Sequence, residues 1–249
     1  MYIKEENKLE RPVMIMGAME DVELDIIKEN LKDIKIEKEK SCTYYKGTLL
    51  NMQVVLCSTN IGSINAAMAT LLGILKYNPK IIIVQGIAGG HGTSIHAKDV
   101  VVATEIININ TLETESKLKG EGSNSLEWKL NNFIDDAGNE VIIEKSNEGL
   151  IEAAKNVEYE HGRVLFGRIG SGDVWNKEVD RILMLNEKYQ TLCEEMEGYA
   201  IAKVANTYEI PMINIRAISN NEVLGEKYIR EVGIYSQEFT LKLIEKIKI

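Results

Sequence analysis

The chain has 249 residues, of which 38 are acidic and 29 are basic, giving a formal charge of −9. Hydrophobic residues make up 45% and charged residues 27%, which is typical of a globular domain and excludes a disordered chain or a coiled coil. The acidic balance argues against nucleic acid or a membrane surface as the main partner, because both are polyanionic and require a basic face.

Strands and helices are predicted in alternation along the chain. In chain order they are strand 13–16, helix 21–31, strands 44–47 and 52–58, helix 63–76, strands 81–84 and 99–109, helix 150–157, strand 163–169, helices 177–188 and 194–208, strand 212–218 and helix 235–247. This alternation predicts an α/β fold, a single domain with a central mixed, largely parallel β-sheet flanked by helices. We expect the domain to span residues 13–249, after an N-terminal extension of residues 1–12.

The cysteines and the N-terminus indicate the compartment. Cys42, Cys57 and Cys193 are far apart and lack paired spacing, which fits a reducing environment and excludes a disulfide scaffold or a zinc motif of known spacing. Residues 1–11 are charged and lack the apolar segment of a signal peptide, and no apolar run has the length of a membrane span. We therefore expect a cytoplasmic protein with neither a membrane nor a nucleic acid as partner.

Glycine-rich or polar turns are predicted after three of the strands, at 17–20, 86–90 and 219–221. Ligands of open α/β sheets bind beyond the carboxyl ends of strands, so these turns are candidate parts of a site. At Gly86, Gly89 and Gly90 a ligand can approach the backbone closely because no Cβ intervenes. The alternative is that they are ordinary turns between packed elements. Neither a dinucleotide fingerprint nor a P-loop is present.

An acidic cluster begins the segment 194–202. If this segment is helical, Glu197 lies on the same apolar stripe as Ile201, where a carboxylate needs a partner because an unpaired buried charge costs several kcal/mol. A helix start, where acidic residues are favourable to the helix dipole, explains Glu194 and Glu195 well but explains Glu197 poorly.

The histidines and tryptophans give weaker signals. His91, His96 and His161 show no ligand spacing and are interpreted as loop residues, so no metal site is predicted. Trp128 is interpreted as a packing residue. Trp175 is either a core residue or a platform on which a ring stacks. The irregular segment 108–129 is where we expect a substrate lid or a partner contact.

Six short segments occur in order between residues 13 and 221. They are Met16-Gly17-Ala18-Met19, Asn60-Ile61-Gly62, Gly86-Ile87-Ala88-Gly89-Gly90, Gly170-Ser171-Gly172-Asp173, Glu195-Met196-Glu197 and Arg216-Ala217-Ile218-Ser219. Together they resemble the purine nucleoside phosphorylase and nucleosidase superfamily, and in particular the methylthioadenosine/S-adenosylhomocysteine nucleosidases. The resemblance implies a homodimeric enzyme without a cofactor. Its substrates would be water and a purine nucleoside, 5′-methylthioadenosine or S-adenosylhomocysteine, and it would release adenine.

The resemblance also implies roles for individual residues. Glu197 would hold the ribose hydroxyls, where a carboxylate stabilises the positive charge that develops on the sugar. Met196 would contact the sugar, Trp175 the base, and the main chain of Asn176 the purine edge. Further substrate contacts are expected from Met19, Ile61, Ile87, Ala88, Gly89 and Glu195.

The general base is expected shortly after the Ala-Met pair. The family spacing Ala-Met-x-x-Glu leads to Val22, one residue before Glu23. The resemblance is restored if one residue is inserted in the turn, so we assign Glu23 as the base that activates water, with Glu20 as the alternative.

At the position of the family's acid stands Asn220, which can donate a hydrogen bond to purine N7 but cannot protonate it. Asparagine here also accompanies a preference for 6-oxopurines in the superfamily, so a nucleosidase or phosphorylase for inosine or guanosine is an alternative. A catalytically inactive nucleoside-binding or storage protein is another. Phosphorylases hold phosphate with Arg and Ser where this chain has Val84 and Ile87, which favours water as the nucleophile.

Overall fold

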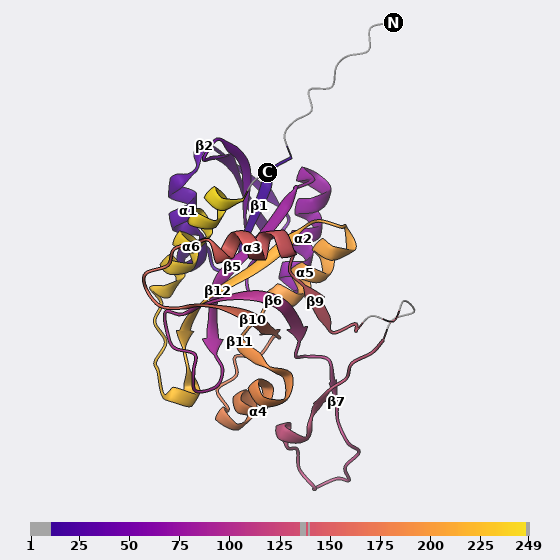
Figure 1. Cartoon of the computed structure of the whole chain (residues 1–249). Helices are drawn as coiled ribbons and strands as arrows, with labels where there is room; N and C mark the ends of the chain where they lie inside the picture. The colour runs from indigo at the N-terminus through magenta and orange to yellow at the C-terminus, as the bar shows by residue number, and fades with distance from the viewer. Residues whose placement is uncertain (1–10, 135–137, 139, 248–249) are drawn as a thin grey trace, which may run out of the picture.

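The computed structural model describes residues 11–134, 138 and 140–247 (Figure 1). Residues 1–10 of the predicted N-terminal extension lie outside this range. At its end, the Arg11 side chain donates hydrogen bonds to the carbonyls of Asn78 and Pro79 (2.9 and 2.7 Å), which places the start of the domain beside the end of a helix.

Strands and helices alternate as predicted. The strands are β1 (Val13–Gly17), β2 (Lys32–Glu39), β3 (Cys42–Leu49), β4 (Met52–Ser58), β5 (Ile81–Gly90), β6 (Val100–Asn108), β7 (Leu112–Glu113), β8 (Lys129–Leu130), β9 (Ile143–Lys145), β10 (Val164–Ser171), β11 (Thr191–Glu195) and β12 (Met212–Asn220). The helices are the π-helix η1 (Glu20–Leu24), α1 (Asp25–Asn30), α2 (Ser63–Tyr77), α3 (Glu148–Lys155), α4 (Val179–Tyr189), α5 (Gly198–Thr207) and α6 (Val232–Lys246), with short 3₁₀ turns η2 (Ser125–Glu127) and η3 (Glu222–Leu224).

One mixed sheet organises the chain. Its strand order is β11-β10-β6-β12-β5-β1-β4-β3-β2, with β9 attached to β6. The pairs β4–β1, β1–β5, β5–β12, β6–β10 and β10–β11 are parallel, whereas β12–β6 and β2–β3–β4 are antiparallel. The end of β5 also pairs antiparallel with β11, which brings two distant strands of the order together. The predicted α/β fold with a central mixed sheet is confirmed.

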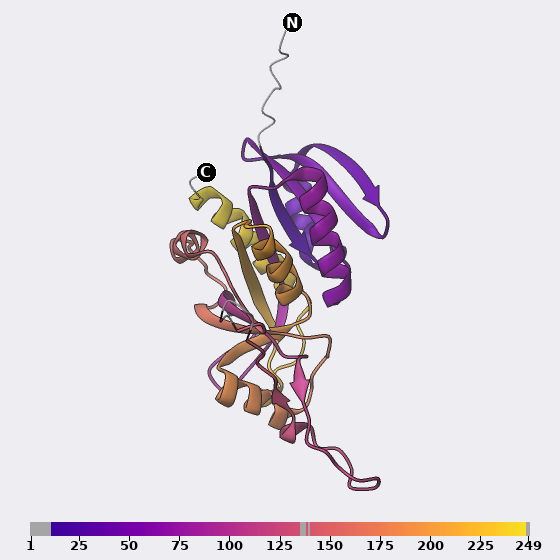
Figure 2. The same cartoon turned by 90° about the vertical axis from the view of Figure 1, so that its right-hand side faces the viewer.

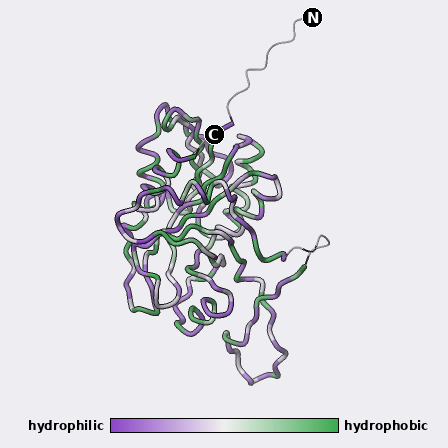
Figure 3. The backbone as a smooth tube through the Cα atoms, viewed as in Figure 1, coloured by the Kyte–Doolittle hydropathy of each residue, from purple (hydrophilic) through white to green (hydrophobic). Residues whose placement is uncertain are grey.

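Helices cover the two faces of the sheet, and the alternation of side chains along each strand supplies both cores. Met14 and Met16 of β1 pack with residues of α2 and α5, whereas Val13 and Ile15 pack with α1, α3 and α6. Figure 2 shows α2 and α6 on opposite sides, and Figure 3 shows hydrophobic stretches running through the central strands. These two layers hold the carboxyl ends of β1, β5 and β12 in fixed positions.

The strand β5 is longer than predicted. A turn was expected at 86–90, but the strand continues through Gly90. This expectation was wrong because both sides of the glycine segment are paired: Gly89 is opposite Asn220 in β12 and Glu194 in β11. Inter-strand hydrogen bonds therefore keep extended a sequence that in isolation favours a turn.

The predicted helix 194–208 was wrong at its start. Thr191–Glu195 form β11, and α5 begins at Gly198 with Glu197 at its N-cap. The acidic residues of this segment are therefore not the exposed first turn of a helix. Pairing with β10 on one side and β5 on the other decides the conformation, because tertiary pairing overrides local propensity in a short strand.

Two further features, an edge strand of the sheet and a projecting hairpin, were not specified by the sequence. The strand β2 was missed because its charged residues mask the alternation, and such an exposed, charged edge is typical of a strand that must not pair with another chain. The segment 108–129 contains β7 and part of a hairpin closed by β8, which projects from the body (Figure 2). Within the described residues, no helix is long and apolar enough to cross a membrane.

Candidate active site

A cavity of about 240 Å³ lies at the carboxyl ends of β1, β5, β11 and β12. All predicted site residues line it: Met19, Glu23, Ile61, Ile87, Ala88, Gly89, Trp175, Asn176, Glu195, Met196, Glu197 and Asn220. The structure adds Ala18, Val174, Glu194, Arg216, Ser219 and Tyr228. Surface depressions of about 420 and 660 Å³ lie elsewhere and contain none of the predicted residues.

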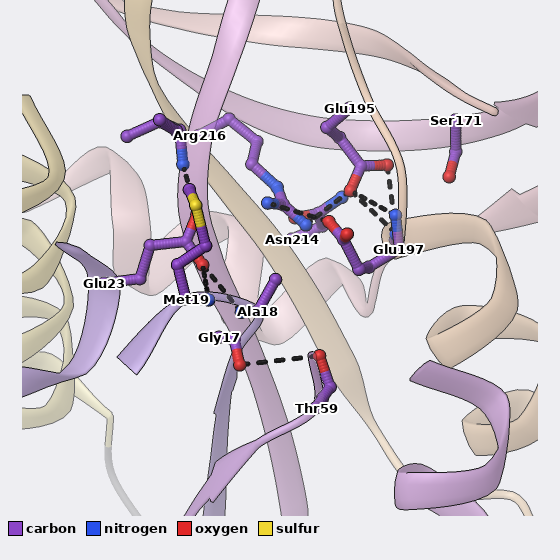
Figure 4. A network of polar contacts seen from close by, with 12 residues as sticks. Gly17, Ala18, Met19, Glu23, Thr59, Ser171, Glu195, Glu197, Asn214 and Arg216 are labelled. Carbon is purple, nitrogen blue, oxygen red and sulfur yellow. Dashed lines mark hydrogen bonds and ion pairs between the residues drawn. The ribbon is translucent and has the colours of Figure 1, made fainter. Parts of the chain in front are cut away.

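Glu23 enters the cavity from the π-helix that follows β1. The backbone hydrogen bonds of a π-helix join residues five apart, one more than in an α-helix, so the turn accommodates an extra residue. Such turns are frequent at functional sites. The Glu23 Oε2 atom accepts hydrogen bonds from the N–H groups of Ala18 and Met19 (2.6 and 3.0 Å), and Oε1 accepts one from Ile87 (3.1 Å). The carboxyl group is thus held between the end of β1 and the middle of β5 (Figure 4).

Two buried glutamines from distant elements stabilise the π-helical turn. Gln85 of β5 donates to the carbonyl of Glu23 and accepts a hydrogen bond from the Ser236 hydroxyl (2.7 Å). Gln237 of α6 donates to the carbonyl of Val22 (3.0 Å) and accepts from two N–H groups of α1 (2.8 and 3.2 Å). Backbone groups that the irregular turn leaves without helical partners are satisfied in this way, so the position of Glu23 is fixed from both sides.

Glu20, the alternative base, faces away from the cavity. Its Oε1 atom accepts hydrogen bonds from Lys28 Nζ (2.8 Å) and the Tyr45 hydroxyl (2.5 Å), and these contacts lower the pKa of the carboxyl group. Glu20 is not among the residues that line the cavity. Of the two candidates, only Glu23 is in a position to reach a bound molecule.

Arg216 is a cation buried in the centre of the site. It is 1% exposed and lies near the end of β12, where its Nε donates to Asn214 Oδ1 (3.0 Å) and its Nη2 donates to Glu195 Oε2. Its Nη1 is 3.6 Å from Glu197 Oε2 (Figure 4). A guanidinium keeps its charge when buried, so it needs anions around it. The sequence signal for this residue was a single charged side chain within the strand Met212–Asn220.

Glu195 joins this cation to a helix. Besides Arg216, its carboxylate accepts hydrogen bonds from the N–H groups of Glu197 (3.0 Å) and Gly198 (2.8 Å to Oε2 and 3.0 Å to Oε1), which open α5. A carboxylate at a helix N-terminus is favoured by the helix dipole. Both oxygens of Glu195 are therefore occupied by the protein.

Glu197 faces the cavity, and its carboxylate accepts fewer hydrogen bonds from the protein than that of Glu195. Its Oε1 atom accepts one hydrogen bond from Gly62 N–H (2.9 Å). Burial, opposed by Arg216 and reinforced by the carboxylates of Glu195 and Glu23, raises the pKa of Glu197 to about 8. Burial also raises the pKa of Glu23, against the opposing effect of Arg216 and three backbone N–H groups. The two carboxyl groups that face the cavity therefore hold protons more tightly than exposed glutamates.

The other end of the cavity is built on Gly89. Asn220 and Glu194 are its register partners in the two flanking strands. The Asn220 Oδ1 atom accepts a hydrogen bond from the Ser219 hydroxyl (2.7 Å), and its Nδ2 donates to Glu222 Oε1 (3.2 Å). The assigned orientation of the amide therefore leaves the second N–H of Nδ2 available to a ligand.

The aromatic and histidine expectations can now be compared with the structure. Trp175 is 69% exposed and lines the open side of the cavity, with its ring 6.3 Å from that of Tyr228, so a core role was wrong. His91 lies in a loop as expected, just after β5, but it is buried against β11 with Nδ1 2.8 Å from Thr191 Oγ1. His96 lies in a loop as expected, with Nδ1 2.8 Å from a carboxylate of Glu226.

The composition of the cavity wall bears on which ligands it can hold. Among the described residues that line the cavity, Arg216 alone is basic, and carboxylates already contact it. Val84 is buried in the core, and Ile87 presents an apolar side chain. Across residues 11–134, 138 and 140–247, no cluster of His, Cys, Asp and Glu has the arrangement of a metal site. An uncharged, hydroxylated ligand suits these walls better than an anion.

The fold and the site define an α/β protein with a carboxylate-lined pocket for a small polar molecule. The chain belongs to the phosphorylase superfamily, whose family model matches residues 12–245. It is 29% identical over 242 residues to the 5′-methylthioadenosine/S-adenosylhomocysteine nucleosidase of Bacillus cereus (strain B4264), covering 95% of this chain and 99% of that one.

Solved structures agree with the fold. The 5′-methylthioadenosine/S-adenosylhomocysteine nucleosidase of Neisseria meningitidis, in complex with methylthio-immucillin-A, superimposes with a TM-score of 0.77 at 24% identity, over 95% of this chain and all of that chain. The nucleosidase of Colwellia psychrerythraea, in complex with adenine, superimposes with a TM-score of 0.78 at 24% identity, over 96% of each chain. The family model confirms the predicted superfamily, and these structures confirm its fold.

The raised pKa of Glu197 predicts a pH-dependent stability. Between its ordinary value of 4.5 and about 8, the folded protein holds a proton that the unfolded chain has released, so the free energy of unfolding falls as pH rises through this window. Glu197→Gln removes this titration. We expect its Tm to exceed that of the wild type by about 3 °C or more at about pH 8, and by less at about pH 5. Calorimetry at both pH values measures this difference.

The matched control is Glu187→Gln, which removes an exposed carboxylate of α4. This variant should follow the wild-type Tm at both pH values. A Glu197→Gln variant whose Tm differs from that of the wild type by the same amount at both pH values would contradict the assigned cause.

Proposed function

We propose that this protein hydrolyses the N-glycosidic bond of a purine nucleoside, 5′-methylthioadenosine or S-adenosylhomocysteine, and releases adenine. The observation that carries the proposal is the pair of buried carboxyl groups, Glu23 and Glu197, that face one cavity. The nucleosidase relatives and the adenine-bound structural neighbour support the same activity.

Glu197 and Met196 act on the sugar. In its ionised form, the Glu197 carboxylate accepts hydrogen bonds from the ribose hydroxyls, and its negative charge stabilises the oxocarbenium-like sugar as the bond to the base breaks. Arg216 lies 3.6 Å from Glu197 Oε2 and lowers the pKa of this carboxyl group against the effect of burial. The ionised form is therefore accessible near neutral pH even though the group is buried.

Glu23 activates the water. A carboxylate offers about four lone-pair positions, and backbone N–H groups fill three of them at Glu23. The remaining position, on Oε1, is available to a water molecule that attacks the sugar carbon. The raised pKa of Glu23 suits a general base that must accept a proton near neutral pH.

Asn220 and Trp175 bind the base. The free N–H of the Asn220 amide donates to purine N7, and the exposed ring of Trp175 stacks against the purine with the main chain of Asn176 at its edge. Asn220 also favours a second candidate, hydrolysis of a 6-oxopurine nucleoside such as inosine or guanosine. Phosphorolysis is disfavoured because, among the described residues that line the cavity, Arg216 is the one basic group and it is already paired with a carboxylate, while Ile87 is apolar.

The functional unit we propose is a cytoplasmic homodimer. One face of α2 presents a stripe of exposed apolar side chains at helical spacing, with Ile64 82%, Leu71 37% and Leu75 66% exposed. Half-exposed Ile61, just before this helix, also lines the cavity, so a second copy on this face would continue the cavity wall. The cysteines are free and buried, which fits a reducing compartment.

The activity is tested by incubating the purified protein with 5′-methylthioadenosine, S-adenosylhomocysteine, inosine and guanosine, with and without phosphate. We expect adenine from the first two at a rate independent of phosphate. Glu23→Gln should lower kcat by about 100-fold or more because the base is lost. The control Glu20→Gln should keep kcat within about threefold of the wild type, because Glu20 faces away from the cavity.

Strict dependence on phosphate would contradict hydrolysis, and release of hypoxanthine or guanine alone would favour the second candidate. Nucleoside binding without turnover would indicate an inactive binding protein. Full activity of Glu23→Gln would overturn the assignment of the base.

The dimer is tested by Ile64→Glu combined with Leu75→Glu, which places two charges on the apolar stripe of α2. We expect the mass from light scattering to fall from twice the chain mass to the 28.0 kDa of one chain. The matched control is Ile36→Glu, at a 62% exposed position on the far edge strand β2, and it should leave the mass unchanged. A wild-type protein with the mass of one chain would contradict the proposal.

A further inference from the structure

The proposed function leaves one group at the base end of the cavity without a role. Glu194 lines the cavity, is 9% exposed, and lies beside Asn220 across Gly89. Its Oε2 atom is 3.4 Å from both Asn176 Nδ2 and His91 Nε2. No contact among the described residues occupies Oε1. A carboxyl group therefore stands in the wall of the site with one oxygen available to a ligand.

His91 stands directly behind this carboxyl group. It is 1% exposed, and its Nδ1 lies 2.8 Å from Thr191 Oγ1. Its Nε2 is buried and makes no hydrogen bond within the part of the chain that the structure describes, and Glu194 Oε2 lies 3.4 Å from it. A buried imidazole nitrogen without a hydrogen bond destabilises the fold. A proton shared between this nitrogen and the Glu194 carboxylate would give it a hydrogen-bond partner.

The register of the strands places Glu194 and Asn220 on opposite sides of Gly89. Residues in register on neighbouring strands project to the same face of a sheet, and here both neighbours flank a glycine that has no side chain. A purine lying over Gly89 with N7 at Asn220 presents its opposite edge to Glu194. On adenine the ring nitrogens of that edge, including N3, are hydrogen-bond acceptors, so the group that faces them must bring a proton.

The reaction needs such a proton. When the bond between the sugar and purine N9 breaks, its electron pair passes to the purine, and an unprotonated adenine anion is a poor leaving group. Asn220 can donate a hydrogen bond but cannot transfer a proton. Among the other carboxyl groups, Glu195 is bound to Arg216 and to the start of α5, and Glu23 and Glu197 face the water and the sugar.

We propose that Glu194 is the general acid for the departing purine and protonates its N3, with His91 as the positioning residue that shares and restores this proton; this inference rests on the proposed hydrolysis of an adenine nucleoside. The bond from the sugar carbon to N9 breaks as the proton passes from Glu194 to N3. Water oxygen bonds to the sugar carbon and gives a proton to Glu23. Solvent returns that proton to the Glu194–His91 pair, so each turnover consumes the nucleoside and one water.

The test compares two leaving groups on one sugar. 5′-Methylthioadenosine needs a proton on its base, whereas the p-nitrophenyl glycoside of 5-methylthioribose releases a stable anion that needs none. We expect Glu194→Gln to lower kcat for 5′-methylthioadenosine by about 100-fold and kcat for the p-nitrophenyl glycoside by less than about threefold. His91→Gln should show the same selectivity with a smaller loss, about tenfold. Adding Asn220→Asp to Glu194→Gln should restore part of kcat, since it supplies an acid at N7.

Equal losses on both substrates would assign Glu194 a structural role and overturn the inference, as would an unchanged kcat for 5′-methylthioadenosine or no gain from Asn220→Asp. In those cases the wild type still hydrolyses 5′-methylthioadenosine, so the proposed function stands. If the wild type cleaves inosine or guanosine and not 5′-methylthioadenosine, the adenine-nucleoside function fails, and the general-acid assignment, which rests on that function, fails with it. If it cleaves no nucleoside, both fail together.

Discussion

The site depends on the burial of one guanidinium among several carboxyl groups. Arg216 contacts Glu195 directly and interacts electrostatically with Glu197 and Glu23. Burial raises the pKa of Glu23 and Glu197, and the single guanidinium offsets this effect only in part, so both groups retain protons more tightly than usual. The arrangement also requires bare backbone at Gly86, where a Cβ would overlap the Glu23 carboxylate and lie 2.7 Å from Arg216 Nη1.

This balance of charge determines which ligand the cavity can accept. An anion would have to compete with Glu195 for a guanidinium that is already paired, and its burial beside Ile87 would be uncompensated. A neutral nucleoside brings hydroxyls that can donate to carboxylates, and it becomes positive on the sugar only as the glycosidic bond breaks. In the proposed reaction the carboxyl groups would therefore stabilise the transition state more than the ground state, which is the condition for a higher rate.

The sequence was sufficient to predict features that depend on local patterns, and insufficient to predict those that depend on contacts between distant residues. Apolar periodicity predicted the central strands and most helices, and the ordered motifs gathered the residues that line the cavity. Residues 191–195 form the strand β11 because they pair with β5 and β10, which are distant in sequence. Local sequence alone therefore predicted a helix start at Glu194. The extra residue before Glu23 was inferred from a resemblance, but its physical basis lies in Gln85 and Gln237, which no local pattern connects to it.

The pairing of β5 with both β11 and β12 explains why the acid that protonates the base can stand on either of these two strands. Gly89 is the floor of the base end, and β11 and β12 bring side chains to it from opposite sides. An amide at 220 supplies a hydrogen bond without a proton, whereas a carboxyl group at 194 backed by His91 can supply the proton from the other edge. Leaving-group chemistry requires that a proton reach the ring and does not fix the nitrogen that receives it, so a strand on either side of Gly89 can carry the acid.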